Sequence, residues 1–157
     1  MRDDIEIRPI RSADAGEVLT IQRAAFVQEA LIYGTADMPP LTQTLEELRA
    51  ELEDNLGHVA LAGPRIVGAV RARLDGTLLL VGRLTIAPDQ QGGGIGSRLL
   101  AAVEAAGRDA GAAQAELFTG SLSEANLRLY TREGYAETER VLGDGDIEQV
   151  FLRKRLS

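Results

Sequence analysis

A glycine-rich turn that runs directly into an amphipathic helix constrains this chain more than any other feature. Residues 91–100 read Gln-Gly-Gly-Gly-Ile-Gly-Ser-Arg-Leu-Leu, and they follow the apolar run of residues 78–86. Glycines leave backbone N–H groups unshielded, and the first turn of a helix adds unpaired N–H groups and the positive end of the helix dipole. The junction therefore predicts a phosphate site that needs no lysine.

The spacing of these glycines separates the junction from two common phosphate-binding motifs. A P-loop requires Gly-x-x-x-x-Gly-Lys-Ser/Thr, and the lysine is absent. A dinucleotide-binding turn requires Gly-x-Gly-x-x-Gly, but Leu99 stands where the third glycine would follow Gly94 and Gly96. The pattern that remains is Gln91-x-x-Gly94-x-Gly96, preceded by Pro88.

Composition narrows the class of protein. The 157 residues suit one domain, which we expect over residues 1–157, and no run approaches the roughly 18 apolar residues of a membrane span. The acidic first residues show no signal region, so we expect a cytoplasmic protein. The chain has no Cys and one His, His58, so we expect no disulfide, no cysteine nucleophile and no metal site. A net charge of −7 disfavours nucleic acid and anionic membranes and favours cationic substrates such as amines.

Hydrophobic periodicity predicts the elements before the glycine turn. A strand at residues 5–8 precedes a helix, residues 34–40 form a loop, and a second helix follows that loop. The expected helix caps are the pairs Asp14 with Glu17 and Thr44 with Glu47. Three antiparallel strands then cover residues 58–62, 66–74 and 77–87.

The same reasoning covers the chain after the glycine turn. The helix that opens there ends at Gly111, and residues 113–119 form a buried strand. Ser121 and Glu124 form the capping pattern of a short helix that runs to about Arg132. Residues 135–142 and 147–153 close the chain as a hairpin.

A second motif lies beyond the glycine turn. Residues 126–135 read Asn-Leu-Arg-Leu-Tyr-Thr-Arg-Glu-Gly-Tyr. Together with Gln91-x-x-Gly94-x-Gly96, and in this order, the pattern Asn-x-x-x-Tyr-x-x-x-Gly-Tyr resembles the signature of the GNAT superfamily of N-acetyltransferases. The order of expected elements is similar to that family over nearly the whole chain. The resemblance implies an α/β (α+β) fold, with a mixed, mostly antiparallel central sheet flanked by helices and a splayed pair of strands that binds acetyl-CoA.

The resemblance also implies where acetyl-CoA binds. The pantetheine arm would pair with Leu84, Thr85 and Ile86, because an extended ligand with amide groups can satisfy an open strand edge. The pyrophosphate would lie on backbone N–H groups of the glycine turn, from Gln91, Gly92, Gly93, Gly94, Ile95, Gly96 and Ser97. Gly92 and Gly93 occupy slots where the family often has basic side chains. We therefore expect backbone binding with a lower affinity for coenzyme A.

Two side chains of the second motif are the expected catalytic and binding groups. Asn126 and Tyr130 are four residues apart, so on a helix they share one face. By the resemblance, Asn126 contacts the pantetheine arm and Tyr130 donates a proton to the departing thiolate, which a phenol with a pKa near 10 can do. The N–H of Ile86 is our candidate donor to the oxyanion. The base stays open among His58, Glu29, Glu116 and a chain of water molecules.

We therefore expect an acetyl-CoA-dependent N-acetyltransferase, an acyltransferase that acts on a primary amine by direct attack in a ternary complex. The acceptor stays open between small amines and the amines of peptides or proteins, and Tyr33 and Asp37 are expected in its cleft from their position alone. The alternative is a noncatalytic acyl-CoA-binding sensor or assembly module. The terminal hairpin offers an edge for a homodimer.

Overall fold

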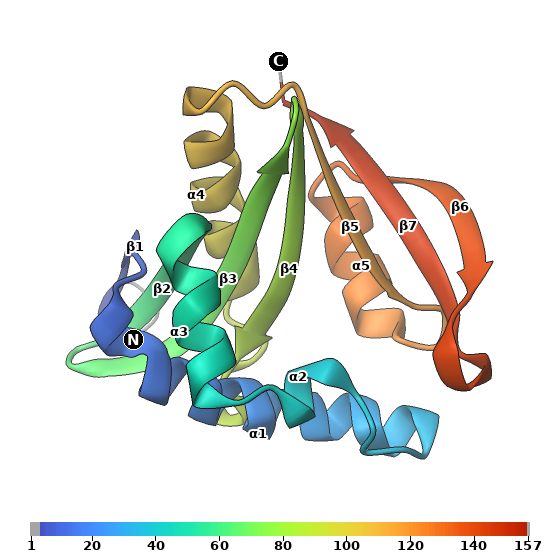
Figure 1. Ribbon diagram of the computed structural model, residues 1–157, viewed down its shortest axis with the longest axis horizontal. Helices are drawn as coiled ribbons and strands as arrows, with labels where there is room; N and C mark the ends of the chain where they lie inside the picture. Colours follow the sequence, from blue (N-terminus) through green and yellow to red (C-terminus); the bar gives the residue numbers. More distant parts are fainter. Residues whose placement is uncertain (1–3, 157) are drawn as a thin grey trace.

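A seven-stranded sheet, in the order β1-β2-β3-β4-β5-β7-β6, forms the centre of the computed structural model, which describes residues 4–156 (Figure 1). Its strands are β1 Ile5–Pro9, β2 Leu56–Ala62, β3 Arg65–Asp75, β4 Leu78–Ile86, β5 Gln114–Gly120, β6 Ala136–Leu142 and β7 Glu148–Arg155. Every neighbouring pair is antiparallel except β4 and β5, which are parallel. The expected mixed, mostly antiparallel sheet is confirmed. The expectation about the N-terminal segment rests partly on residues 1–3, which lie outside the described residues.

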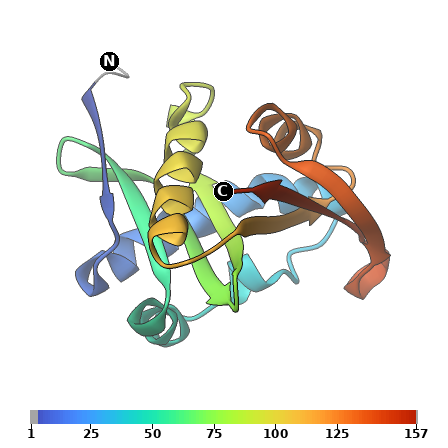
Figure 2. The same cartoon turned by 90° about the horizontal axis from the view of Figure 1, so that it is seen from above.

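Helices cover both faces of the sheet. They are α1 Ala15–Tyr33, α2 Pro39–Thr42, α3 Leu45–Asp54, α4 Ile95–Asp109 and α5 Glu124–Arg132, with short 3-10 turns at Ser12–Asp14, Pro88–Gln90 and Asp144–Asp146. Helices α4 and α5 lie on one face, and α1 and α3 lie on the other (Figure 2). Helix α4 packs closely on the sheet, since a Cβ at Gly107 would lie 2.6 Å from Leu79 Cδ2. Within residues 4–156, no helix combines the length and the apolar character that crossing a membrane requires.

Strands β4 and β5 meet at one end only. Residues Leu78, Leu79 and Leu80 pair with Gln114, Ala115 and Glu116, and beyond this short ladder the two strands diverge (Figure 1). The splayed strand pair expected from the sequence is therefore present. The divergence leaves the C-terminal half of β4 without a strand neighbour on its β5 side.

A bulge in β4 lies where this divergence begins. Ala69 of β3 pairs with Thr85, and Arg71 pairs with Gly82, so Arg83 and Leu84 together oppose a single residue of β3. Arg83 has a φ of 54°, which is uncommon for a residue with a side chain. Because a bulge bends its strand and increases the local twist, it helps to turn the end of β4 away from β5.

Side-chain hydrogen bonds hold the two halves of the split sheet together. Glu104 of α4 is 4% exposed and accepts from Tyr135 Oη and from Lys154 Nζ of β7, each at 2.8 Å. At the opposite end, α1 runs beneath the gap (Figure 1), and Tyr33 Oη lies 2.8 Å from Ser123 Oγ in the loop before α5. The gap is therefore bounded by strand pairing at one end and by α1 at the other.

Asp14 is the N-cap residue of α1, as expected, but its side chain makes no capping hydrogen bond to that helix. A 3-10 turn precedes α1 and holds Asp14 in a helical conformation. The Asp14 carboxylate instead accepts from Arg8 Nη1 and Nη2 at 2.8 and 2.9 Å and from the Arg11 N–H at 2.7 Å. Glu17 accepts the N–H of Ile66 at 2.6 Å and thereby ties α1 to the start of β3.

The two other predicted caps have different outcomes. Thr44 and Glu47 form the expected capping box, with hydrogen bonds of 3.2 and 2.8 Å. Ser121 does not cap α5, because that helix begins one residue after Ser123, which is its N-cap residue. The Ser123 hydroxyl bonds across to α1 rather than to its own helix.

Candidate active site

A cleft of about 490 Å³ opens between the free end of β4, the glycine turn, α5 and the C-terminal half of α1. We call it the first cleft. Most of the predicted cofactor residues line it, namely Leu84, Thr85, Ile86, Gln91, Gly92, Gly94, Ile95, Gly96, Ser97 and Asn126. Gly93, Tyr130, Tyr33 and Asp37 are not among its lining residues. The structure thus brings together two segments separated by a helix and a strand, which the sequence motifs had linked only by resemblance.

The glycines of the turn serve two different purposes. Gly92 and Gly94 have φ values of 81° and 82°, and a Cβ at either position would meet nothing within 4 Å. Glycine is favoured there by backbone conformation, which leaves the N–H groups at the start of α4 accessible. At Gly96 a Cβ would lie 3.2 Å from Leu129 Cδ2, so this glycine allows α4 and α5 to approach each other.

The end of β4 presents backbone groups to the gap. The N–H of Ala87 donates to the carbonyl of Val67 on β3 at 2.8 Å. Because backbone groups alternate in direction along an antiparallel strand, the N–H and C=O of Ile86 face away from β3 and toward the gap. Gln91 Nε2 approaches the Ile86 carbonyl at 3.5 Å, a long hydrogen bond.

Thr85 supplies a buried polar atom without a partner. Its side chain is 2% exposed and lines the first cleft, and its Oγ1 has no hydrogen-bond partner. Buried hydroxyls in folded proteins are nearly always bonded to protein or water, so an orphaned one beside a cleft marks a place for a polar ligand. The open strand edge, the accessible N–H groups of the turn and this hydroxyl all fit an extended ligand that carries amide and phosphate groups.

A carboxylate and two polar side chains form a cluster at the floor of the first cleft. Glu29 of α1 accepts from Ser123 Oγ at 2.6 Å and from Asn126 Nδ2 at 3.1 Å. Asn126 Nδ2 also donates to Thr119 Oγ1 at 3.2 Å. Both protons of the Asn126 amide are therefore used within the protein, and its contribution to ligand binding must come from the carbonyl oxygen.

Glu29 is the only one of the three candidate bases that lines the first cleft. Glu116 lies elsewhere on β5 and accepts from Arg153 Nε at 2.8 Å. His58 lies on β2, paired with Pro9 and Val70, and burial lowers the pKa of its imidazole. The helical recurrence of Ala25, Glu29 and Ile32, which share a face of α1 and line the cleft, is the sequence signal that distinguishes Glu29.

Tyr130 is a buried residue of α5. Its side chain is 7% exposed, and its ring lies edge-on to Tyr135 with the centroids 6.2 Å apart. Burial raises the pKa of Tyr130 well above its ordinary value, and the negative charge of Glu29 raises it further. The phenol therefore keeps its proton.

Tyr33 and Asp37, which we expected in the acceptor cleft, do not line the first cleft. Tyr33 Oη accepts from the N–H of Leu122 at 3.1 Å in addition to its contact with Ser123, and Gly120 leaves room for its ring. Asp37 is exposed, and its N–H donates to Thr35 Oγ1 at 3.1 Å. Tyr33 thus joins α1 to the loop before α5.

Two cations of the first cleft were not predicted. Arg128 and Arg132 are four residues apart on α5 and line the same cleft as the glycine turn. Their spacing puts them on one helix face, which is the signal that could have found them. They supply positive charge near the turn, where Gly92 and Gly93 provide none.

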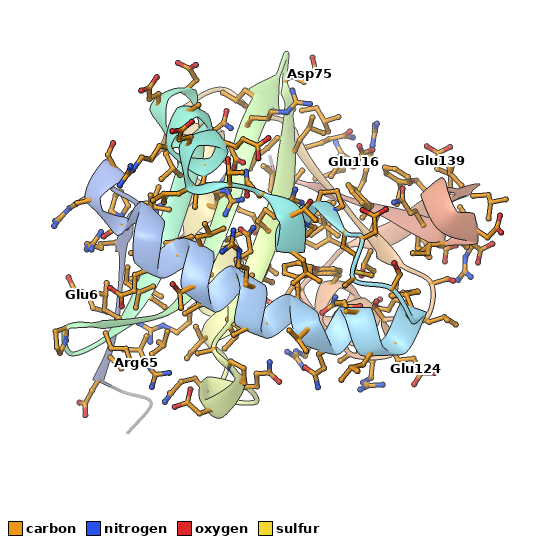
Figure 3. All side chains as sticks on the ribbon, turned by 60° about the horizontal axis from the view of Figure 1, so that its bottom comes forward. Glu6, Arg65, Asp75, Glu116, Glu124 and Glu139 are labelled. Atoms are coloured by element: carbon orange, nitrogen blue, oxygen red, sulfur yellow. The ribbon has the colours of Figure 1, made fainter. Side chains whose placement is uncertain are left out.

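A second cleft of about 440 Å³ lies on the face of the sheet that carries α3. Residues of α3, β3, β4, β5 and β7 line it, and β4 contributes the segment that ends at Arg83. In Figure 3, Glu116 of the second cleft lies on the same side of α1 as Asp75 in the β3–β4 hairpin. Glu124 of the first cleft lies on the other side of α1. The two clefts therefore flank the β4 bulge.

Comparisons with known proteins agree with this geometry. The profile of the family described as "Acetyltransferase (GNAT) domain" matches residues 28–156. The PaiA N-acetyltransferase of Thermoplasma acidophilum, solved in complex with coenzyme A, has a TM-score of 0.79 at 18% identity, over 96% of this chain and 98% of that one. The ribosomal-protein-S18-alanine N-acetyltransferase of Escherichia coli has a TM-score of 0.80 at 16% identity, over 98% and 94% of the two chains.

A curated relative matches at the level of sequence. The chain is 28% identical over 127 residues to the UPF0157 protein YqkA of Bacillus subtilis, which covers 81% of this chain and 36% of the relative. The chain therefore spans about a third of the length of that relative.

Proposed function

Because this chain belongs to the GNAT family of acetyltransferases, we propose that it transfers the acetyl group of acetyl-CoA to a primary amine by direct attack in a ternary complex. The gap between β4 and β5 is the observation that carries this proposal. Its open edge at Leu84, Thr85 and Ile86 lines the same cleft as the glycine turn before α4. One extended ligand with amide groups at one end and phosphates at the other satisfies both.

The residues of the first cleft divide the binding between them. The edge of β4 would pair with the pantetheine arm, with Thr85 Oγ1 and the Asn126 carbonyl oxygen as additional polar contacts. The N–H groups between Gln91 and Ser97 would bind the pyrophosphate. Arg128 and Arg132 would add positive charge near the phosphates.

Acetyl-CoA, when bound, would supply a thioester whose carbonyl carbon an amine can attack. The N–H of Ile86 would donate a hydrogen bond to the carbonyl oxygen as negative charge grows there. Glu29, which lines the first cleft, would accept the proton that the acceptor ammonium must lose before its neutral amine attacks. Tyr130 would give its proton to the sulfur when the C–S bond breaks, and the second proton lost by the amine nitrogen would restore the phenol. The products are then the amide, the free thiol and the one proton released through Glu29.

The relatives bear on the acceptor. The Escherichia coli protein is described as acting on an alanine of ribosomal protein S18, whose amine is of the class proposed here. Its identity with this chain is 16%, which supports the fold and leaves the acceptor of this chain to be measured.

Calorimetric titration with acetyl-CoA tests the proposal directly. Gly94→Ala places a side chain on a backbone with a φ of 82°, so it should distort the turn and weaken binding at least tenfold. Gly63→Ala is the matched control, since Gly63 has a φ of 61°, is equally open and lies in the β2–β3 turn. Both variants should lose a similar stability, on the order of 1 kcal/mol.

The outcomes separate three cases. Binding by the wild type and the Gly63 variant, with loss in the Gly94 variant, supports the first cleft as the acetyl-CoA site. Absence of binding to the wild type overturns the proposal. Binding without release of free thiol in the presence of any amine supports the alternative, a noncatalytic acyl-CoA-binding module.

A further inference from the structure

The second cleft contains an arginine whose hydrogen-bonding capacity the protein does not fully satisfy. Arg83 lines this cleft, and its Nε is buried without a hydrogen-bond partner. A buried guanidinium nitrogen without a partner is costly, because that N–H has lost water and gained no acceptor in return. An anionic ligand in the cleft would supply the acceptor that this N–H lacks.

The surroundings of Arg83 raise this cost. Burial lowers the pKa of its guanidinium, and the charge of Arg71 lowers it further, while Glu51 opposes the change. Arg83 is also the bulge residue with a φ of 54°, a conformation that costs on the order of 1–2 kcal/mol for a residue with a side chain. Strain and unpaired polar atoms that coincide at one residue are typical of functional positions.

The carboxylates of the second cleft are already engaged by other arginines. Glu51 accepts from Nε of Arg71, whose Nη1 donates to Gln22 at 2.9 Å and whose Nη2 donates to Gln43 at 3.1 Å. Arg71 is 3% exposed, so this network is a fixed part of the structure. Glu116 is held by Arg153 at 2.8 Å. Neither carboxylate supplies a partner for Arg83 Nε.

An aromatic wall stands beside this charge. Phe118 of β5 also lines the second cleft and is 51% exposed, and its ring centroid lies 5.2 Å from that of Phe151 on β7. Exposed aromatic rings beside a cleft offer apolar area to a ligand. The cleft therefore combines an anion-binding group with an apolar surface.

The second cleft adjoins the predicted point of acetyl transfer. Arg83 precedes Ile86 on β4 by three residues, on the order of 10 Å of strand. Leu84, which follows Arg83 directly, lines the first cleft. An acceptor bound at Arg83 would thus lie beside the strand on which the thioester is proposed to bind.

We propose that the second cleft binds the carboxylate of the acceptor, and that the acceptor is a free amino acid with an apolar side chain. Arg83 Nε donates to the carboxylate, and Phe118 and Phe151 cover the side chain. This inference rests on the function proposed above and deepens it. A polyamine would place a second cation beside Arg83 and Arg71, and a protein N-terminus carries no carboxylate close to its amine.

Acetylation of matched pairs of amines tests this inference. The probes are the standard amino acids, the corresponding amino acid amides, which keep the amine and lose the carboxylate, and spermidine. For the wild type, kcat/KM should be at least tenfold higher for an apolar amino acid than for its amide. Arg83→Gln should raise KM for the acid at least tenfold, leave kcat within about twofold and leave KM for the amide unchanged.

Controls remove the effects of folding and of net charge. Arg108→Gln makes the same change of charge at an exposed position in the last turn of α4 and should alter neither KM. Arg83→Lys should fall between the wild type and Arg83→Gln, because it keeps the charge and loses the planar donors. The comparison of acid with amide in the wild type needs no variant, so it decides the question even where Arg83→Gln does not fold.

The failures are distinguishable. Absence of acetyl-CoA binding to the wild type overturns both the proposed function and this inference. Intact acetyl-CoA binding with equal use of acid and amide, with a preference for spermidine, or with an equal change of both KM values in Arg83→Gln overturns this inference alone.

Discussion

The two clefts that flank the β4 bulge are built from different parts of the chain. The first cleft presents backbone: the edge of β4 at Leu84–Ile86 and the N–H groups of the glycine turn. The second cleft presents charged and aromatic side chains, with Arg83 and Phe118 on strands that have already separated. A backbone site is suited to a ligand of constant chemistry, whereas a side-chain site can change with its residues.

The difference predicts how the two clefts respond to substitution. Exchanges of side chains in the first cleft should have a moderate effect on binding, because the groups proposed to bind acetyl-CoA belong mainly to the backbone. The second cleft depends on Arg71, because the buried Arg71 guanidinium holds Glu51, Gln22 and Gln43 in place through hydrogen bonds. The predictions below run from the largest expected effect to the smallest.

Arg71→Met should be the most damaging change to folding. It leaves Gln22 Oε1 without its donor and removes the cation that pairs with Glu51, and breaking a buried ion pair of this kind costs about 3 kcal/mol. In a chain of this size the melting temperature should fall by about 9 °C, measured by calorimetry or circular dichroism. Arg73→Met, two positions along the same strand and exposed, should change it little. Equal melting temperatures for the two variants would show that the second cleft does not depend on its buried network.

Tyr130→Phe should affect turnover and leave binding intact. Loss of the proton donor should lower kcat about 100-fold, or about 2.7 kcal/mol, while the Kd for acetyl-CoA stays within about twofold. Tyr135→Phe is the matched control, since its ring packs edge-on to that of Tyr130 but its hydroxyl donates to Glu104. An unchanged kcat in Tyr130→Phe would remove this residue from the chemistry.

Asp14→Asn should lower the folding stability without changing either cleft. The pair with Arg8 lowers the pKa of Asp14, so its stabilisation is present above the unfolded pKa of about 3.9 and is lost as the pH falls through the lower folded value. At pH 7 the variant should be about 1 kcal/mol less stable, or about 3 °C in melting temperature. The difference from the wild type should close in strong acid, and the Kd for acetyl-CoA at pH 7 should be unaltered. A constant difference at every pH would contradict the ionic explanation.

Thr85→Val tests the one orphaned side-chain atom of the first cleft. Valine has the same shape, and Oγ1 has no partner in the protein, so stability should be unchanged or slightly raised. The Kd for acetyl-CoA should rise about threefold, about 0.7 kcal/mol, if the hydroxyl contacts the ligand. Thr119→Val is the comparison, because Thr119 Oγ1 accepts from Asn126 and its loss should lower stability. A Kd unaffected by Thr85→Val would leave binding in the first cleft to the backbone alone.

Much of the fold could be predicted from local patterns. The order of strands and helices follows from periodicity, and the capping box of Thr44 and Glu47 follows from spacing. Asp14 stands at the expected N-cap position of α1, but its carboxylate binds Arg8 instead of capping the helix. The predicted cap at Ser121 was wrong, because α5 begins after Ser123. Spacing alone cannot show which competitor lies nearby in space.

The candidate site divides in the same way. The glycine turn was predictable because its geometry is local, and most of its residues line the first cleft. Tyr33 and Asp37 were assigned to the acceptor cleft from position alone, and neither lines a described cleft. Arg83 was not predicted, since its significance depends on a bulge and on Arg71 and Glu51, which come from other elements.

By itself, the sequence determined the local conformations: the glycine turn, the helix that follows it, the periodicity of the strands and the spacing of Asn126 and Tyr130 on one helix. These depend on residues within a few positions of one another, so short-range sterics and hydrogen bonding decide them. Only the tertiary structure decided the divergence of β4 from β5, the placement of Glu29 rather than His58 or Glu116 in the lining of the first cleft, and the unpaired state of Arg83 Nε. Each of these is a balance among groups distant in sequence, and that balance is set when the sheet and its helices pack together.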